Sequence, residues 1–128
     1  MLDTNALVPI VFAPKDLTRL GRAIVELAED YQAELVVPAM ALIESEFLMR
    51  RERIRHRVPF ERFIAAIMGR DYMRIEPLGT EQIALIPSLL GIPDMHDQLI
   101  AAHAITNDAP LMTDDHLIRE SGLVECIW

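Results

Sequence analysis

Acidic side chains recur in this sequence at places where they could share a divalent cation. Asp3 follows a short apolar opening, Asp97 lies in "IPDMHDQLIAAHAI" (92–105), and Asp114 and Asp115 follow "APLMT". Gathering several carboxylates in one crevice is unfavourable unless protons or a cation neutralise them, because like charges raise each other's pKa. Oxygen ligands without cysteine favour a hard ion such as Mg²⁺ or Mn²⁺. We expect such an ion wherever these acids meet.

Glu44 is the most informative of the acids. Its neighbours one turn away on the predicted helix 39–51 are all apolar: Met40, Ala41, Phe47 and Leu48. A buried carboxylate without a partner is costly, and no basic residue stands within helical reach. We therefore expect Glu44 to point into a site. Glu46, by contrast, has Arg50 four residues on, which predicts an ordinary surface pair.

Each aspartate also has a structural explanation. Asp94 and Asp97 could occupy the first turn of a helix, and for Asp94 we prefer this interpretation. Asp3 could cap the turn after the first strand, and the two acids after "APLMT" could cap a short helix "DHLIRE". Taken singly, each acid is weak support for chemistry. Their joint placement at strand ends, together with Glu44, favours a metal site.

The elements that must position these acids alternate between strands and helices. Apolar patterns predict strands at the N-terminus, 33–38, 73–78, 109–113 and 122–128, and helices at 16–30, 39–51, 58–70, 79–91, 92–105 and 115–120. This alternation implies parallel βαβ units, hence an α/β fold: a three-layer α/β/α sandwich with a central, mainly parallel sheet. In such sheets ligands bind at the carboxyl ends of the strands, where several of the acids lie.

Three finer expectations concern the helices. Helix 16–30 should bury one face, made of Leu17, Leu20, Ile24 and Leu27. Helix 39–51 is apolar almost all round, as a buried helix is. Helix 79–91 should begin at an N-cap, Thr80, and break or kink at Pro87.

The composition predicts one domain spanning residues 1–128, since no linker or repeat interrupts the chain. Hydrophobic residues make up 52% and mean hydropathy is +0.21, which indicates apolar surface reserved for a partner. No apolar run approaches the roughly 18 residues of a membrane helix, so we expect no membrane contact. The single cysteine, Cys126, excludes an internal disulfide and favours the cytoplasm. We expect it buried in the last strand.

The formal net charge of −8 is unusual for a protein that binds nucleic acid. Five of the eleven arginines fall in "RRERIRHR" (50–57), which we interpret as a solvated helix end in preference to a phosphate-binding patch. Carboxylates that hold divalent cations lower the formal charge without repelling phosphates, because the ion dominates the local field.

Four stretches carry a resemblance to a known family: "LDTNALV" (2–8), "VVPAMALIESEFL" (36–48), "HDQLIAAHA" (96–104) and "PLMTDD" (110–115). In this order and spacing the chain resembles PIN-domain ribonucleases, most of all the VapC toxins of type II toxin–antitoxin modules. The resemblance covers essentially the whole chain. It implies a metal-dependent endoribonuclease that cleaves RNA, with Mg²⁺ or Mn²⁺ and the catalytic acids on Asp3, Glu44, Asp97 and Asp115. It also assigns supporting roles to Thr4, Asn5 and Thr113.

The same resemblance implies partners: a cognate antitoxin that lays an apolar segment over the domain and offers a basic side chain to the acids, and a second copy in a homodimer. Two features depart from the family. Only two residues precede Asp3, so either the central strand is clipped or the native start lies upstream of Met1. Pro38 stands where relatives often have serine.

Other functions with an acidic crevice fit less well. A receiver domain needs a lysine after a late strand, whereas the only lysine is Lys15. A haloacid-dehalogenase-type phosphatase needs an Asp-x-Asp pair where this chain has "DTN". The remaining alternative is a catalytically inactive PIN-like module that binds a protein.

Overall fold

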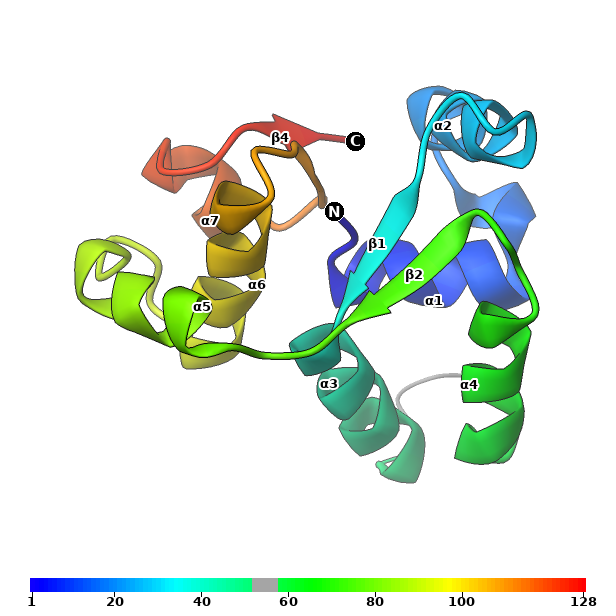
Figure 1. Ribbon diagram of the computed structural model, residues 1–128, viewed down its shortest axis with the longest axis horizontal. Coiled ribbons are helices and arrows are strands. Elements are labelled where there is room, and N and C mark those ends of the chain that lie inside the picture. Colours follow the sequence, from blue (N-terminus) through cyan, green and yellow to red (C-terminus); the bar gives the residue numbers. More distant parts are fainter. Residues whose placement is uncertain (52–57) are drawn as a thin grey trace.

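The computed structural model describes residues 1–51 and 58–128, so most of the arginine-rich stretch 50–57 lies outside the described residues. The elements are, in chain order, α1 (Thr4–Phe12), η1 (Pro14–Asp16), α2 (Arg19–Glu29), β1 (Leu35–Pro38), α3 (Ala39–Arg50), α4 (Phe60–Met68), β2 (Met73–Glu76), α5 (Thr80–Leu85), η2 (Ile86–Ser88), α6 (Met95–Thr106), β3 (Leu111–Met112), α7 (His116–Ser121) and β4 (Cys126–Ile127) (Figure 1).

The sheet consists of two parallel pairs joined by the N-terminus. β1 pairs with β2 and β3 pairs with β4, each in parallel. Leu2 forms a parallel bridge with Met112, and its backbone N–H donates to Val36 O at 2.9 Å. The first residues therefore lie between the two pairs. This central strand is reduced to a single bridge, and Asp3 follows it directly.

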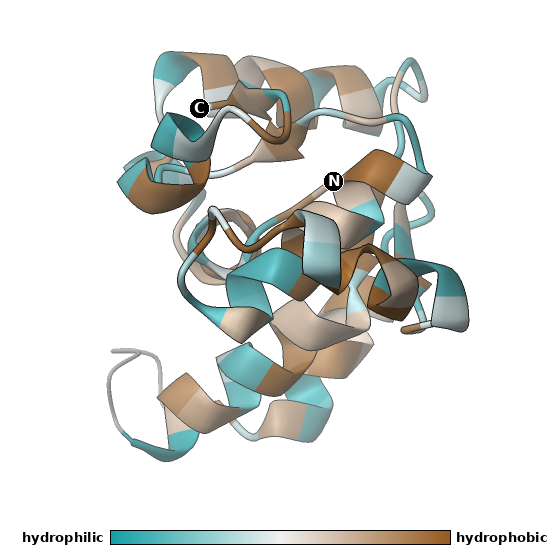
Figure 2. Ribbon diagram, turned by 90° about the vertical axis from the view of Figure 1, so that its left-hand side faces the viewer, coloured by the Kyte–Doolittle hydropathy of each residue, from teal (hydrophilic) through white to brown (hydrophobic). Residues whose placement is uncertain are grey.

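Helices cover both sides of the strands. Figure 1 shows α5, α6 and α7 on one side of β1 and β2, and α1, α2 and α4 on the other. Apolar and polar residues alternate along the helices (Figure 2), as expected of helices with one face on a core. The prediction of an α/β sandwich with a mainly parallel sheet is confirmed.

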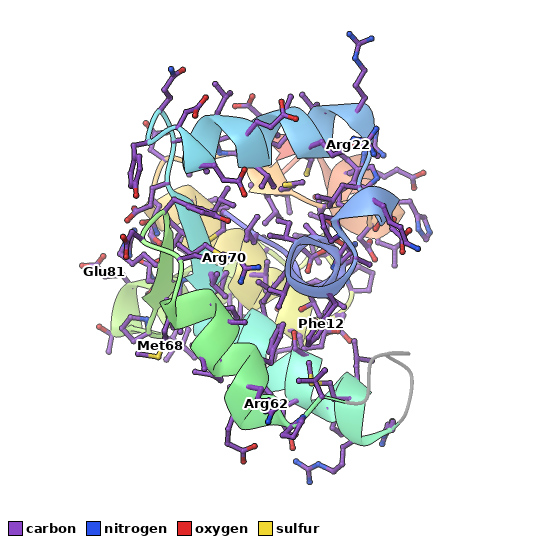
Figure 3. All side chains as sticks on the ribbon, turned by 90° about the vertical axis from the view of Figure 1, so that its right-hand side faces the viewer. Phe12, Arg22, Arg62, Met68, Arg70 and Glu81 are labelled. Atoms are coloured by element: carbon purple, nitrogen blue, oxygen red, sulfur yellow. The ribbon has the colours of Figure 1, made fainter. Side chains whose placement is uncertain are left out.

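The core contains the apolar residues of the strands and the inner faces of the helices. Leu7, Val37, Phe63 and Ile100 are all fully buried. Phe63 stacks on Phe12 with 5.2 Å between ring centroids, and Figure 3 shows Phe12 between α1 and α4. Such aromatic contacts add to the stabilisation from buried apolar area. The contact between Phe12 and Phe63 holds α1 against the core, and α1 begins directly after Asp3.

Helix α1 was not predicted. It begins immediately after Asp3, whose carboxylate accepts a hydrogen bond from the backbone N–H of Thr4 at 2.6 Å. Pro9 lies inside it, and an interior proline normally argues against a helix. The burial of Leu7 and Ile10 against the core outweighs this local cost.

The buried face of α2 is turned from the predicted one. Leu20 and Leu27 are 48% and 45% exposed, whereas Gly21 and Ala28 are buried. A Cβ at position 21 would stand 2.8 Å from Met112 Cε. Glycine lets the helix approach β3 this closely, so Gly21 and Ala28 face inward while Leu20 and Leu27 do not. The prediction holds for Leu17, which is 3% exposed, and for Ile24, which packs against the core.

Two further helix predictions were wrong in detail. Helix α3 is not buried all round, because Ile43 and Phe47 are exposed. The N-cap of α5 is Gly79 instead of Thr80, and the Gln82 side-chain oxygen accepts from the Gly79 N–H at 3.0 Å. The break at Pro87 is confirmed, since α5 gives way to the 3₁₀ turn η2.

Cys126 lies in the last strand as predicted, but it is only half-buried. In the two described stretches of chain, no helix is long and apolar enough to cross a membrane.

Candidate functional site

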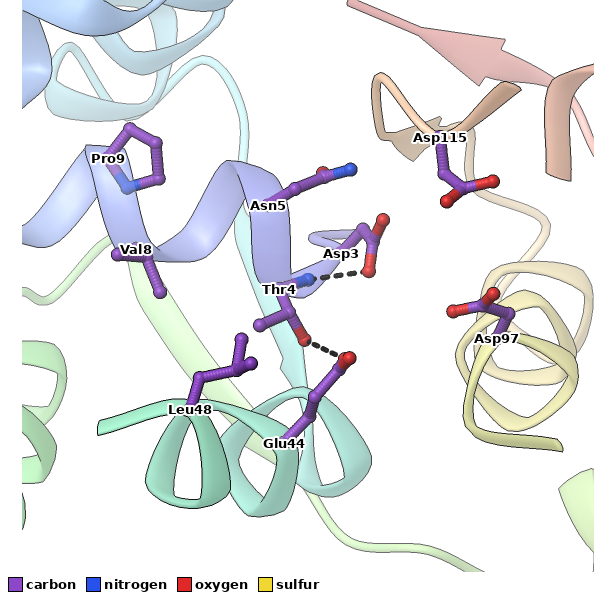
Figure 4. A pocket seen from close by; sticks show the side chains of 9 residues that line it. All are labelled: Asp3, Thr4, Asn5, Val8, Pro9, Glu44, Leu48, Asp97 and Asp115. Carbon is purple, nitrogen blue, oxygen red and sulfur yellow. Dashed lines mark hydrogen bonds between the residues drawn. The ribbon is translucent and has the colours of Figure 1, made fainter. Parts of the chain in front are cut away.

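The four predicted acids line one pocket of about 360 Å³ (Figure 4). Asp3 caps α1 and Glu44 lies in the middle of α3. Asp97 lies in the first turn of α6, and Asp115 caps α7. Each acid therefore comes from a different element, at the edge of the sheet where the central strand ends.

Asp3 is the most enclosed acid, with 4% of its surface exposed. Its Oδ1 accepts from the Thr4 backbone N–H at 2.6 Å and its Oδ2 from the Thr113 hydroxyl at 2.5 Å. Burial raises the pKa of Asp3 to about 6, although both hydrogen bonds act in the opposite direction. The charges of Glu44 and Asp115 add to the increase. The fold thus holds a carboxylate in an environment that disfavours its charge.

Thr113 connects three parts of the site. Its hydroxyl donates to Asp3 and accepts from the Asp115 backbone N–H at 3.0 Å. The Asn5 side-chain amide also donates to it at 3.3 Å, and donates to the carboxylate of Asp114 as well. Of the predicted auxiliary residues, Thr113 therefore contacts Asp3 and Asp115, whereas Asn5 contacts Thr113 and Asp114, and Asp114 does not line the pocket.

Glu44 has a partner that helical spacing could not predict. The hydroxyl of Thr4, on α1, donates to Glu44 Oε2 at 2.6 Å. The expected pairing of Glu46 with Arg50 is present on the outside of α3. Glu44 itself points into the pocket beside Leu48 (Figure 4).

Asp97 carries the larger pKa shift. Burial raises its pKa to about 7, and the charges of Asp3 and Asp115 contribute next. The helix cap is supplied by a different residue: Asp94 Oδ1 accepts from the His96 backbone N–H at 2.7 Å, which confirms the cap interpretation of Asp94. Because Asp94 caps α6, the Asp97 carboxylate is left to face the pocket.

Asp115 both caps a helix and lines the pocket. Its Oδ1 accepts from the backbone N–H groups of Leu117 and Ile118 at 2.8 and 3.2 Å, as an N-cap does. The same side chain lines the pocket beside Asp97, and both face Asp3 (Figure 4). Both cap hydrogen bonds use Oδ1, which leaves Oδ2 for the pocket, so capping and pocket lining are compatible.

The donor set fits a hard divalent cation in its chemistry. The acids offer only oxygen, and Asn5 Oδ1, next to them, is buried without a hydrogen-bond partner in the described structure. The side chains are spread around the pocket, however. Within residues 1–51 and 58–128, no three His, Cys, Asp or Glu side chains form a group that could hold a metal ion as they stand. Side-chain rotations toward the pocket centre would have to accompany binding.

The apolar wall of the pocket is formed by Val8, Pro9 and Leu48, and of these only Leu48, a neighbour of Glu44 on its helix, was named from the sequence. Two of these lie on α1, the helix that was not predicted. The signal was present in Asp3, an aspartate directly before a run of helix-compatible residues, which is an N-cap pattern.

A buried histidine was also missed. His103 is 0% exposed, and its Nδ1 lies 3.2 Å from Glu76 Oε2. Asn107 donates to the same oxygen at 2.8 Å. These contacts tie the second half of α6 to the end of β2. The helix that carries Asp97 is therefore anchored at a point distant from the pocket.

Comparison with known families gives a match to the PIN domain over residues 1–121. This chain belongs to the PIN domain family. PIN domains are generally nucleases. Among solved structures, VapBC2 from Rickettsia felis, bound to a DNA fragment from the promoter, is similar with a TM-score of 0.75 and 18% identity. The match covers 100% of this chain and 97% of that one. At this identity the likeness shows the shared fold. A search of curated proteins found no match.

Proposed function

We propose that this PIN domain is a metal-dependent endoribonuclease and the toxin of a toxin–antitoxin pair. The observation that carries the proposal is the meeting of four carboxylates from four elements in one pocket, two of them with pKa values raised to about 6 and 7. Clustered, partly buried carboxylates repel one another and lower the stability of the fold, so their presence calls for a functional reason. Perturbed acids in a concave pocket are typical of functional sites.

In this proposal Asp3, Asp97 and Asp115 hold one or two Mg²⁺ or Mn²⁺ ions. When bound, the metal lowers the pKa of a water molecule and stabilises charge on the phosphate. Glu44 completes the metal's shell or orients the attacking water. Thr113 and Thr4 hold the carboxylates of Asp3 and Glu44 through hydrogen bonds of 2.5 and 2.6 Å, and Asn5 supports Thr113 from α1.

An apolar surface suitable for the antitoxin lies on a face of α3 different from the one that carries Glu44. A groove of about 370 Å³ runs between α3 and α4, lined by Ala39, Leu42, Ile43, Glu46, Phe60 and Ile64. An apolar segment laid there would cover Ile43, which is 58% exposed. A basic side chain farther along the same partner chain would be attracted to the carboxylates of the acid pocket. The likeness to VapBC2 supports a partner of this kind.

The test is cleavage of total cellular RNA by the purified protein. With Mg²⁺ or Mn²⁺ we expect discrete cuts that disappear with EDTA and with Asp97→Asn. The matched control is Asp71→Asn, which changes an exposed acid outside the pocket and should leave cleavage intact. Folded protein, free of antitoxin, that cuts no RNA under these conditions contradicts the proposal.

A binding module without catalysis is the second candidate, favoured by the spread of the carboxylates around the pocket. Glu44→Gln separates the two. A nuclease should lose cleavage when this carboxylate is neutralised. A binding module should keep its partner and become no less stable, because one repelling charge is gone.

A further inference from the structure

A second hollow adjoins the acid pocket. It has a volume of about 280 Å³ and is lined by Ile43, Glu44, Phe47, Leu48, Asp94 and His96. Glu44 and Leu48 line both cavities. A chain whose phosphate lay among the acids would therefore place its next group in this hollow.

The hollow offers an accessible aromatic ring. Phe47 is 46% exposed and the neighbouring Ile43 58%, although α3 could have carried polar residues there. The Arg51 guanidinium carbon lies 3.9 Å from the centroid of the Phe47 ring. The arginine covers one face of the ring, so an unpaired base would stack on the other face of Phe47.

The other side of the hollow is polar and fixed. His96 Nδ1 lies 3.0 Å from Asp94 Oδ1, which also accepts from the His96 backbone N–H. The imidazole is thus held in place at the start of α6. Planar histidine side chains also provide surfaces for base stacking.

The charges of the lining decide which part of a nucleotide fits. Glu44 and Asp94 are both acids, so a phosphate would be repelled from this hollow. A base is uncharged, has apolar faces for Phe47, and in adenine, cytosine and guanine carries an amino group from which a carboxylate can accept a hydrogen bond.

We propose that this hollow holds an unpaired, amino-bearing base of the nucleotide next to the scissile phosphate, stacked on Phe47. The inference rests on the proposed nuclease function and adds to it a position for one base beside the scissile phosphate. A base inside a duplex is stacked on both faces, so it cannot enter the hollow without leaving its pair.

The test measures binding separately from cleavage. The probes are a short fluorescent single-stranded oligoadenylate and an oligomer of the same length without bases, both bound to the Asp97→Asn protein with Mg²⁺. Adding Phe47→Ala should weaken oligoadenylate binding about tenfold, because one base–aromatic stack is lost. It should leave binding of the baseless oligomer unchanged. Phe47→Trp should restore binding, and Phe47→Leu, which keeps apolar volume without a ring, should not.

The control variant is Ile83→Ala, which removes a side chain of similar exposure, 49%, from α5; it should change neither affinity. Equal weakening of both probes by Phe47→Ala, or no weakening of either, overturns the base site. The hollow would then belong to a protein partner. Cleavage assays with an otherwise native chain distinguish this failure from that of the nuclease proposal. Metal-dependent cleavage with no effect of Phe47 overturns only the base site.

Discussion

At the scale of single residues, the site is defined by carboxylates that the fold holds against their electrostatic preference. Asp3 is fixed by two hydrogen bonds and Asp97 faces the acids of three other elements. Their raised pKa values have the same leading cause, burial, and neighbouring charges add to it. Residues kept in so unfavourable a setting are candidates for function, because packing alone would favour a neutral side chain.

Neutralising Asp97 should make the metal-free protein more stable while abolishing cleavage. The pKa of Asp97 is raised to about 7 and its side chain is half-buried. After allowance for solvent screening, we expect Asp97→Asn to increase the free energy of unfolding by about 1 kcal/mol at neutral pH. Urea unfolding of both proteins in EDTA measures this change in the free energy of unfolding. The matched change Asp71→Asn should be nearly neutral, and a loss of stability in Asp97→Asn would contradict the electrostatic account.

Removing the Thr113 hydroxyl should shift the pH dependence of activity. The hydroxyl lowers the pKa of Asp3 by donating to its carboxylate. In Thr113→Val that hydrogen bond is lost, so the pKa should rise further above 6 and half-maximal cleavage should move to higher pH. The variant should also be about 1–2 kcal/mol less stable, because buried polar groups lose their partner. Thr113→Ser keeps the hydroxyl, and its pH profile of cleavage should match that of the native chain.

At the scale of elements, helix starts position the acids. Asp3, Asp94 and Asp115 each accept backbone N–H groups at the start of a helix. Two of these caps line the pocket, whereas Asp94 leaves the pocket to Asp97, three residues on. From the sequence, each acid could be a helix cap or a metal ligand. In the structure, Asp3 and Asp115 both cap a helix and line the pocket, whereas Asp94 only caps.

Loss of the Asp94 cap should loosen the turn that carries Asp97. Asp94→Ala leaves the first N–H groups of α6 without their acceptor, which costs about 1 kcal/mol. Cleavage should fall as well, because the Asp97 backbone is no longer fixed. Asp94→Asn retains an accepting oxygen and removes the charge, so thermal unfolding and cleavage assays of the two variants separate capping from electrostatics. If both variants lose the same amount, charge and not capping is responsible.

At the scale of the whole molecule, metal and pH should be linked through stability. In EDTA, the free energy of unfolding should fall as pH rises from about 4 to 7, because Asp3 and Asp97 keep protons in the folded state that they release when unfolded. Mg²⁺ or Mn²⁺ competes with those protons. Its stabilising effect should therefore be larger at about pH 8 than at about pH 5. Melting temperatures at both pH values, with and without metal, provide the measurement. Equal metal effects at the two would contradict a site made of these acids.

The apolar surface of the chain should also be used in self-association. Leu90 and Met95 are 73% and 58% exposed around the start of α6, and the composition favours an oligomer. We expect a homodimer, with a mass by light scattering twice the chain's 14.5 kDa. Leu90→Glu should shift the equilibrium toward monomer, whereas Arg19→Glu on the exposed start of α2 should not. A monomeric native chain at high concentration would contradict the expectation.

The alternation of strands and helices can be predicted from the amino-acid sequence, and with it the layered fold and the strand ends at which acids collect. Periodicity is a local signal, and these elements follow it. It also singled out Glu44, since an acid among apolar neighbours is visible within one helix. Helix α1 escaped detection because Pro9 is a local objection that only the packing of Leu7 and Ile10 overrides.

The hydrogen-bond partners of the acids, by contrast, depend on how distant segments pack together. The contacts from Thr4 to Glu44 and from Thr113 to Asp3 join residues 40 and 110 positions apart. Long-range pairs of this kind depend on how α1 sits on the sheet, and no spacing rule encodes that. The orientation of α2 also depends on distant packing, because a side chain at position 21 would collide with Met112 of β3. Local patterns predict elements, and close packing between them decides the chemistry of each side chain.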